Sequence, residues 1–96
     1  MRRYDSLIAN REQILAIAAR HGARNVRIFG SVVRGEDTPE SDVDLLVEFE
    51  PGRGLLNHAA LIEELQNLLG CKVDVASRNG LKPRIRQRVI EEAVVL

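Results

Sequence analysis

The sequence is poor in residues on which several classes of protein depend. It has one cysteine, so no internal disulfide can form and nothing points to an oxidising compartment. One tyrosine, two phenylalanines and no tryptophan are too few for a surface that stacks single-stranded bases. Fourteen basic residues balance fourteen acidic ones, which argues against electrostatic binding of long nucleic acid. We therefore expect no direct nucleic-acid binding, while a small anionic ligand stays compatible because local charge placement matters more than the total.

Long hydrophobic runs are missing as well. No apolar stretch approaches the roughly 20 residues that span a bilayer. Polar residues interrupt the segment from Leu7 to Ile17, so it does not form a signal-peptide core. We therefore expect a cytoplasmic protein that does not enter a membrane. The length fits a single domain, 1–96, and 45% hydrophobic with 29% charged residues is an ordinary globular composition.

The spacing of apolar residues predicts helices that alternate with strands. Predicted helices cover 10–21, 31–34, 55–69 and 81–93, and predicted strands cover 25–29, 43–49 and 71–76. Asn10 is the expected N-cap of the first helix, and Gly70 is expected to stop the third. Each strand has one apolar face. The sequence therefore predicts an α/β (α+β) fold with a small mixed β-sheet, with helices mainly on one face and the other face partly open.

Three aspartates are predicted to project from the open face. Asp42 and Asp44 are two positions apart in a strand, so they share a face and lie roughly 6–7 Å apart along it. Their repulsion, roughly 2–4 kcal/mol at an effective dielectric constant near 20, does nothing for a strand's stability. The pair suits Mg²⁺, which takes oxygen ligands from one or two carboxylates and from phosphates. Asp74 has the same orientation in the next strand, so three carboxylates converge if those strands are neighbours.

Gly30 and Ser31 are the candidate phosphate contacts. A glycine lets a triphosphate approach the backbone closely, and Ser31 adds a hydroxyl and can cap a helical turn with free N–H groups. Metal ions between carboxylates and phosphates would favour attack on the α-phosphorus, and Asp74 is the candidate base for the attacking hydroxyl. Arg34 either contacts phosphate or pairs with Glu36.

These residues carry a family resemblance. The Gly-Ser pair, ten intervening residues and Asp-x-Asp resemble the signature of the DNA polymerase β-like nucleotidyltransferase superfamily. The string Gly-Ser-x-x-Arg-Gly, followed by Ser-Asp-x-Asp-Leu-Leu-Val, resembles its smallest branch, the minimal nucleotidyltransferase (MNT) proteins. The similarity reaches the segment 82–94, and one departure is Val33, where alanine is common. The resemblance implies the nucleotidyltransferase fold, with nucleotide contacts from Gly30 and Ser31 and metal binding by Asp42, Asp44 and Asp74.

The resemblance also implies a function. Many MNT proteins are antitoxins encoded beside a helical HEPN ribonuclease, which they silence by transferring AMP onto a tyrosine. It thus implies Mg²⁺-dependent transfer of AMP from ATP to a hydroxyl of such a toxin, within a hetero-oligomer. Two alternatives stay open: a non-catalytic antitoxin that acts by binding alone, and a small-molecule nucleotidyltransferase of the aminoglycoside type. Larger relatives use a second domain to hold the base and acceptor, so we expect a partner to complete the site.

Several other residues carry two interpretations. His58 is expected to pack or cap rather than catalyse, His21 to sit at a helix end, and Cys71 to be structural. The apolar residues 94–96 either pack internally or join an interface. A solvated surface and an anion-facing or partner-facing surface are equally compatible with the basic residues Arg78, Lys82, Arg84, Arg86 and Arg88.

Overall fold

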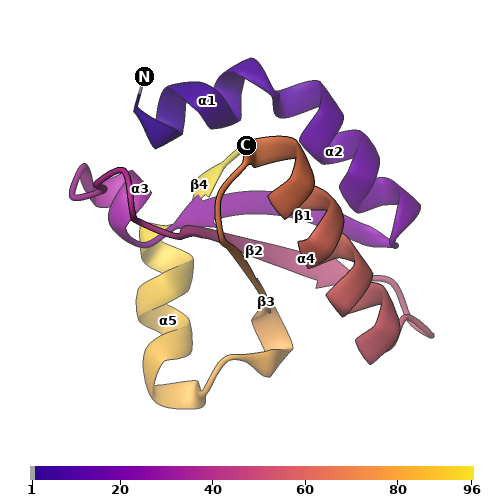
Figure 1. Ribbon diagram of the computed structural model, residues 1–96. Coiled ribbons are helices and arrows are strands. Elements are labelled where there is room, and N and C mark those ends of the chain that lie inside the picture. Colours follow the sequence, from indigo (N-terminus) through magenta and orange to yellow (C-terminus); the bar gives the residue numbers. More distant parts are fainter. Residues whose placement is uncertain (1) are drawn as a thin grey trace.

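The computed structural model describes residues 2–96 (Figure 1). Its helices are α1 (Arg3–Ala9), α2 (Arg11–Arg20), α3 (Ser31–Arg34), α4 (Leu55–Leu69) and α5 (Pro83–Glu92), with a short 3-10 helix over Arg78–Gly80. Its strands are β1 (Ala23–Phe29), β2 (Val43–Phe49), β3 (Val73–Ser77) and β4 (Val94–Val95). Gly70 ends α4 with a left-handed φ of 69°, as predicted. Within residues 2–96, no helix combines the length and apolar character needed to cross a membrane.

The strands form one mixed sheet in the order β3-β2-β1-β4. β1 is antiparallel to β2 and β4, whereas β2 and β3 are parallel. Parallel neighbours need a crossover connection, and α4 supplies it. The helices α1, α2 and α4 lie on one side of the sheet, and α5 lies on the other (Figure 1). The predicted mixed sheet, with helices mainly on one face and the second and third predicted strands as neighbours, is confirmed.

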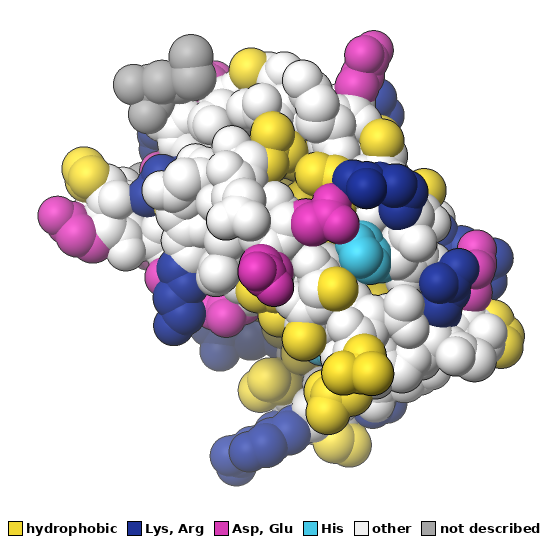
Figure 2. All heavy atoms as spheres, turned by 45° about the vertical axis from the view of Figure 1, so that its right-hand side comes forward, with side chains coloured by type: hydrophobic (Ala, Val, Ile, Leu, Met, Phe, Trp, Pro, Cys, Tyr) yellow, Lys and Arg dark blue, Asp and Glu magenta, His cyan; other side chains and the backbone are white. Residues whose placement is uncertain are grey.

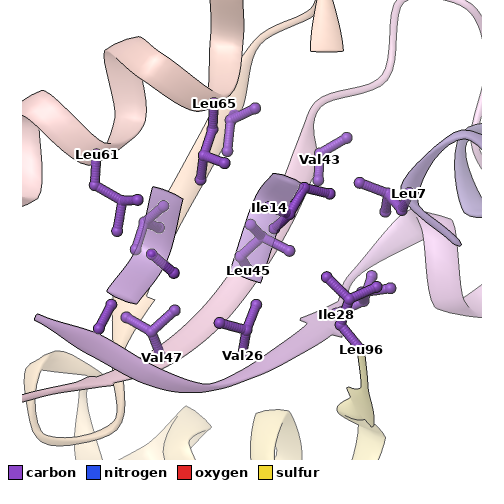
Figure 3. Close-up of a cluster of buried hydrophobic side chains, with 14 of the residues drawn as sticks. Leu7, Ile14, Val26, Ile28, Val43, Leu45, Val47, Leu61, Leu65 and Leu96 are labelled. Carbon is purple, nitrogen blue, oxygen red and sulfur yellow. The ribbon is translucent and has the colours of Figure 1, made fainter. Parts of the chain in front are cut away.

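The face under α2 and α4 holds the hydrophobic core (Figure 3). Val43 and Leu45 of β2 are buried against Leu61 and Leu65 of α4 in a single cluster. Each such side chain contributes about 1.5–3 kcal/mol when it leaves water. Leu46 alternates to the opposite face and is also buried, although it lies outside this cluster. The second face is therefore covered in part rather than fully open.

The outer surface of α2 and α4 carries charges of both signs. Glu64 of α4 accepts a hydrogen bond from Arg20 of α2 at 2.7 Å and lies 2.9 Å from the His21 ring. The hydrogen bond with His21 lowers the pKa of Glu64, and Arg20 adds to this effect. Figure 2 shows basic and acidic side chains next to one another on this side of the molecule. His21 follows the end of α2, as predicted. Charges of both signs on this surface are consistent with the zero net charge of the chain.

The N-terminal region differs from the prediction of one helix that starts after Asn10. Residues 3–9 form a separate helix, α1, and α2 starts at Arg11. Asn10 lies between them and does not cap α2 with its side chain. Its amide instead donates to the carbonyl oxygen of Ser6 at 2.8 Å. The pattern missed α1 because this short helix buries a single side chain, Leu7, too little for a recognisable apolar stripe.

Of the C-terminal residues, Leu96 packs internally whereas Val94 and Val95 are exposed, so the open alternative is decided for Leu96 alone. Val94 and Val95 form β4 beside Ile28 and Arg27 of β1. Leu96 is buried, and its N–H donates to the carbonyl oxygen of Val26 at 3.0 Å. A two-residue strand is too short for an alternating pattern, so it was not predicted. It makes β1 an inner strand of the sheet.

Candidate active site

The candidate phosphate loop follows the end of β1. Gly30 has a φ of 80°, a left-handed conformation that favours glycine, and it occupies the N-cap position of α3. Phe29 pairs with Asp44 across the sheet, so Gly30 lies beside the Asp44 carboxylate. A Cβ atom added at Gly30 would overlap that carboxylate. Both the backbone conformation and the space at this position therefore require glycine.

Ser31 is the first residue of α3, not its cap. The prediction that the Ser31 hydroxyl caps this turn is wrong, because the left-handed Gly30 already occupies the N-cap position. In α3 the N–H groups of Val33 and Arg34 donate to the Gly30 carbonyl oxygen at 3.1 and 3.2 Å. The hydrogen bonds of this turn therefore do not depend on the Ser31 side chain. Its hydroxyl stays compatible with the predicted contact to a phosphate.

Two of the three aspartates lie opposite each other on the adjacent parallel strands β2 and β3. Asp44 of β2 is paired in register with Asp74 of β3, and adjacent strands are about 4.8 Å apart. Partial burial, together with the charges of Asp74 and Asp42, raises the pKa of Asp44 to about 6. Arg34 opposes this shift, and Glu92 adds to it. The structure therefore brings Asp44 and Asp74 together, within the electrostatic range of Asp42.

Asp42 is the outlying member of the three. It lies one residue before β2, and its carboxylate is 3.7 Å from the Lys72 ammonium group. Within residues 2–96, no three His, Cys, Asp or Glu side chains are close enough to hold a metal ion by themselves. The predicted convergence of three carboxylates is thus only partial in this conformation. A cation at Asp44 would relieve the repulsion among the aspartates, so the donor set fits Mg²⁺ completed by phosphate oxygens.

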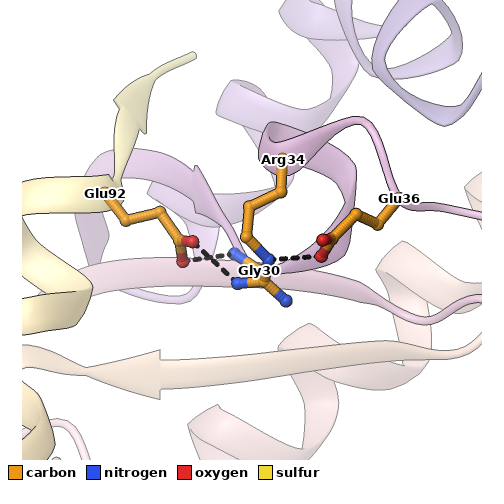
Figure 4. A network of polar contacts seen from close by, with 4 residues as sticks. All are labelled: Gly30, Arg34, Glu36 and Glu92. Carbon is orange, nitrogen blue, oxygen red and sulfur yellow. Dashed lines mark hydrogen bonds and ion pairs between the residues drawn. The ribbon is translucent and has the colours of Figure 1, made fainter.

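Arg34 joins two segments that are far apart in the sequence (Figure 4). Its Nε donates to Glu36 at 2.6 Å, so one of the two predicted interactions is present. Its Nη1 donates to Glu92 of α5 at 2.7 Å. The other Glu92 oxygen accepts the Gly30 N–H at 3.0 Å. The hydrogen bonds with Glu36 and Glu92 raise the pKa of Arg34 above its ordinary value.

Glu92 is the residue that sequence reasoning missed. Partial burial acts to raise its pKa, but the hydrogen bonds from Arg34 and the Gly30 N–H outweigh burial and leave the pKa lowered. The carboxylate is therefore held in its charged form. Glu92 follows Gly30 by 62 positions. A contact between residues so far apart in the sequence produces no short motif of fixed spacing. No sequence pattern could therefore have identified Glu92.

A groove of about 500 Å³ lies at the far ends of β2 and β3. It is lined by Arg24, Glu48, Phe49, Ser77, Arg78, Asn79 and Arg86. Arg86 also donates to the carbonyl oxygen of Leu81 at 3.0 Å, which fixes the turn before α5. Two of the basic residues in the predicted surface, Arg78 and Arg86, thus border a groove instead of lying on a flat face.

The histidine of α4 has the packed role that was predicted. The His58 ring nitrogen Nε2 lies 2.6 Å from the carbonyl oxygen of Val75 in β3. The ring also lies near Phe49, with 5.4 Å between the ring centroids. Cys71 is partly buried against the core. His58 therefore fixes α4 to the sheet edge and is separate from the aspartates.

Known proteins match this chain over most of its length. Residues 11–96 match the family described as "Nucleotidyltransferase domain". The chain is 40% identical over 84 residues to a "putative protein adenylyltransferase" of Methanocaldococcus jannaschii, covering 88% of this chain and 90% of that relative. It is 45% identical over 75 residues to protein adenylyltransferase MntA of Thermococcus cleftensis, covering 78% and 76% of the two chains.

Solved structures share the fold. One, described as a "putative minimal nucleotidyltransferase", has a TM-score of 0.87 and 54% identity, covering 96% of this chain and 94% of that chain. A chain in a crystal structure of a toxin–antitoxin with AMP-PNP has a TM-score of 0.77. It is 19% identical, with 90% of this chain and 71% of that chain covered, so this second likeness concerns the fold alone.

Proposed function

The chain belongs to the nucleotidyltransferase domain family, and on this premise we propose that it transfers AMP from ATP to a hydroxyl group of a partner toxin. The observation that carries the proposal is the in-register pair Asp44 and Asp74 beside Gly30. It unites two carboxylates with a backbone segment that a phosphate can approach. Relatives named as protein adenylyltransferases support a protein hydroxyl as the acceptor.

Each residue has a distinct task in this reaction. Asp42 and Asp44 would hold Mg²⁺ together with oxygens of the triphosphate. When bound, the metal ion would withdraw negative charge from the reacting phosphate. The missing side chain of Gly30 leaves room for the Asp44 carboxylate beside the backbone that would face the phosphates, and the Ser31 hydroxyl would donate to a phosphate oxygen. Asp74 accepts the proton of the acceptor hydroxyl. The acceptor oxygen bonds to the α-phosphorus, the bond from that phosphorus to the bridging oxygen breaks, and pyrophosphate leaves.

The partner supplies the acceptor. We propose a helical HEPN ribonuclease as the toxin, a tyrosine as the acceptor, and a cytoplasmic hetero-oligomer as the working form. The sheet carries its aspartates on the face next to α5, and the groove at the far ends of β2 and β3 is bordered by Arg24, Arg78 and Arg86. Acidic or polar side chains of a partner would complement these guanidinium groups. A partner that extends from this groove to the start of β3 would present its hydroxyl to Asp74.

Mass spectrometry of the partner tests the proposal. The protein encoded by the adjacent gene would be incubated with this chain and MgATP. We expect its mass to rise by one or more AMP units, because the toxin hydroxyl becomes esterified. Asp74→Asn should suppress this mass change without preventing association, because it removes the proton acceptor and leaves the surface intact.

A triple variant separates the proposal from its main rival. Asp42, Asp44 and Asp74 would all be replaced by asparagine, and inhibition of the toxin would be measured beside its mass. Equal inhibition by the wild type and the triple variant, with no mass change in either case, would establish a non-catalytic antitoxin and refute AMP transfer. AMP transfer to an aminoglycoside in place of the partner would instead support the small-molecule reaction.

A further inference from the structure

The last turn of α5 places an anionic group against the candidate phosphate loop. One Glu92 oxygen accepts the Gly30 N–H at 3.0 Å, and the other accepts Arg34 Nη1 at 2.7 Å (Figure 4). The carboxylate thus engages one backbone donor and one guanidinium donor together. Both donors come from the segment proposed to bind the triphosphate. Glu92 itself comes from the other end of the chain and has no place in that proposal.

A carboxylate and a phosphate make the same hydrogen bonds with such donors. Each presents at least two oxygens on one central atom, accepts backbone N–H groups and pairs with guanidinium nitrogens. An N–H group has one hydrogen to donate, so it cannot serve Glu92 and a phosphate oxygen fully at the same time. Two anions in one place would also repel each other. Glu92 and a phosphate at this position therefore exclude one another.

The Glu92 contact is also one that can be released. No residue of α5 is buried, so this helix is not fixed by core packing. The Glu92 side chain retains 23% of its exposure, and its contacts with the loop are polar. Rotation of this side chain would free both donors without disturbing Leu96, which is buried beyond it. Arg34 would keep its second carboxylate partner, Glu36.

We propose that Glu92 is a further residue of the nucleotide site, whose carboxylate takes the place of a phosphate until MgATP displaces it. This inference rests on the proposed function, because it assumes that the loop binds a triphosphate. Displacement lowers the apparent affinity for the nucleotide in proportion to the fraction of molecules with the loop free. Arg34 passes from Glu92 to a phosphate in the same step. Its two predicted interactions, with Glu36 and with phosphate, then occur together in the nucleotide-bound state.

Calorimetric titration with MgATP tests this inference on the isolated chain. Glu92→Gln removes the negative charge and weakens both contacts, so we expect it to bind MgATP about tenfold more tightly than the wild type. Glu91→Gln is the matched control. Glu91 is the preceding residue of α5, and it accepts a hydrogen bond from Gln87 at 3.0 Å within the same helix. The control should bind MgATP as the wild type does.

The possible outcomes separate this inference from the proposed function. Unchanged or weaker binding by Glu92→Gln, with binding by the wild type, would overturn the inference and leave the proposed function intact. If neither protein binds MgATP, the proposed function fails and this inference fails with it. Glu92→Asp gives a second measurement should Glu92→Gln not fold. It keeps the charge but is too short to reach both donors, and tighter binding is again the expected result.

Discussion

The helices α4 and α5 lie on opposite sides of the same sheet and are held there by different forces. α4 buries Leu61 and Leu65 in the hydrophobic core, whereas no residue of α5 is buried. α5 instead makes polar contacts through Arg86 at its start and Glu92 at its end. Hydrophobic burial does not depend on one partner atom, but a hydrogen bond can be exchanged for another. One side of the sheet is therefore held by apolar packing, and the other by polar contacts that can be exchanged.

The largest effect should come from a change on the face of the sheet next to α5 that leaves the fold unaltered. Asp44→Asn removes a proposed metal ligand, so we expect AMP transfer to fall at least about a thousandfold, equivalent to about 4 kcal/mol in the activation barrier. The fold should persist because the side chain lies outside the core. Transfer of labelled AMP and thermal melting would measure the two properties. Transfer near the wild-type rate would refute the assignment of Asp44.

Truncation of one side chain in each helix tests the comparison directly. Leu65→Ala leaves a cavity in the core and should lower the free energy of unfolding by about 2–5 kcal/mol. Ile85→Ala, in α5, should cost less than about 1 kcal/mol because the isoleucine is 40% exposed. Urea denaturation measures both values. Equal losses for the two variants would show that α5 is packed as firmly as α4.

A smaller effect is expected from the hydroxyl of Ser31, at the start of α3. Ser31→Ala removes a proposed hydrogen bond to a phosphate but leaves the backbone of α3 in place. We expect MgATP binding to weaken by about 1–2 kcal/mol, without a change in melting temperature. Ser6→Ala in α1 is the control, and its affinity should match the wild type. An unchanged affinity of Ser31→Ala for MgATP would show that the Ser31 hydroxyl does not contribute to nucleotide binding.

The smallest effect concerns pH. Because the pKa of Asp44 is raised from 3.8 to about 6, the folded state binds its proton more tightly than the unfolded state. Ionisation of Asp44 therefore lowers the free energy of unfolding as pH rises from about 4 to 6, and below about pH 4 this penalty is absent. Asp44→Asn has no ionisable group at this position, so its free energy of unfolding lacks this penalty. The shift corresponds to at most about 3 kcal/mol, and solvent screening of this half-buried carboxylate reduces the effect. The melting temperature of Asp44→Asn should therefore exceed that of the wild type at pH 7 by an amount equivalent to about 1 kcal/mol, and this excess should vanish near pH 4. An excess that is constant with pH would refute the raised pKa.

The sequence predicted those features that depend on neighbours along the chain. The alternation in β2 and β3 placed Asp44 and Asp74 opposite the apolar residues, and their adjacency in the sheet is confirmed. Gly30 was recognised as a place of close approach, but its overlap with Asp44 required the register of β1 against β2. Features that join distant segments escaped prediction. The contact of Glu92 with Gly30 and the pairing of β4 with β1 both depend on how the chain folds back on itself.

The register of β2 against β3 has a consequence for how mutations can affect the site. Val43 pairs with Val73, and the next pair along is Asp44 with Asp74. A slip of β3 by one residue against β2 would turn Val73 out of the core and move Asp74 away from the face that carries Asp44. The alignment of the two carboxylates is therefore enforced by apolar residues that touch no ligand. Substitutions on the surface can therefore accumulate without misaligning the carboxylates. A sequence that keeps the apolar pairs between β2 and β3 also keeps the carboxylate positions from which a lost activity could be regained.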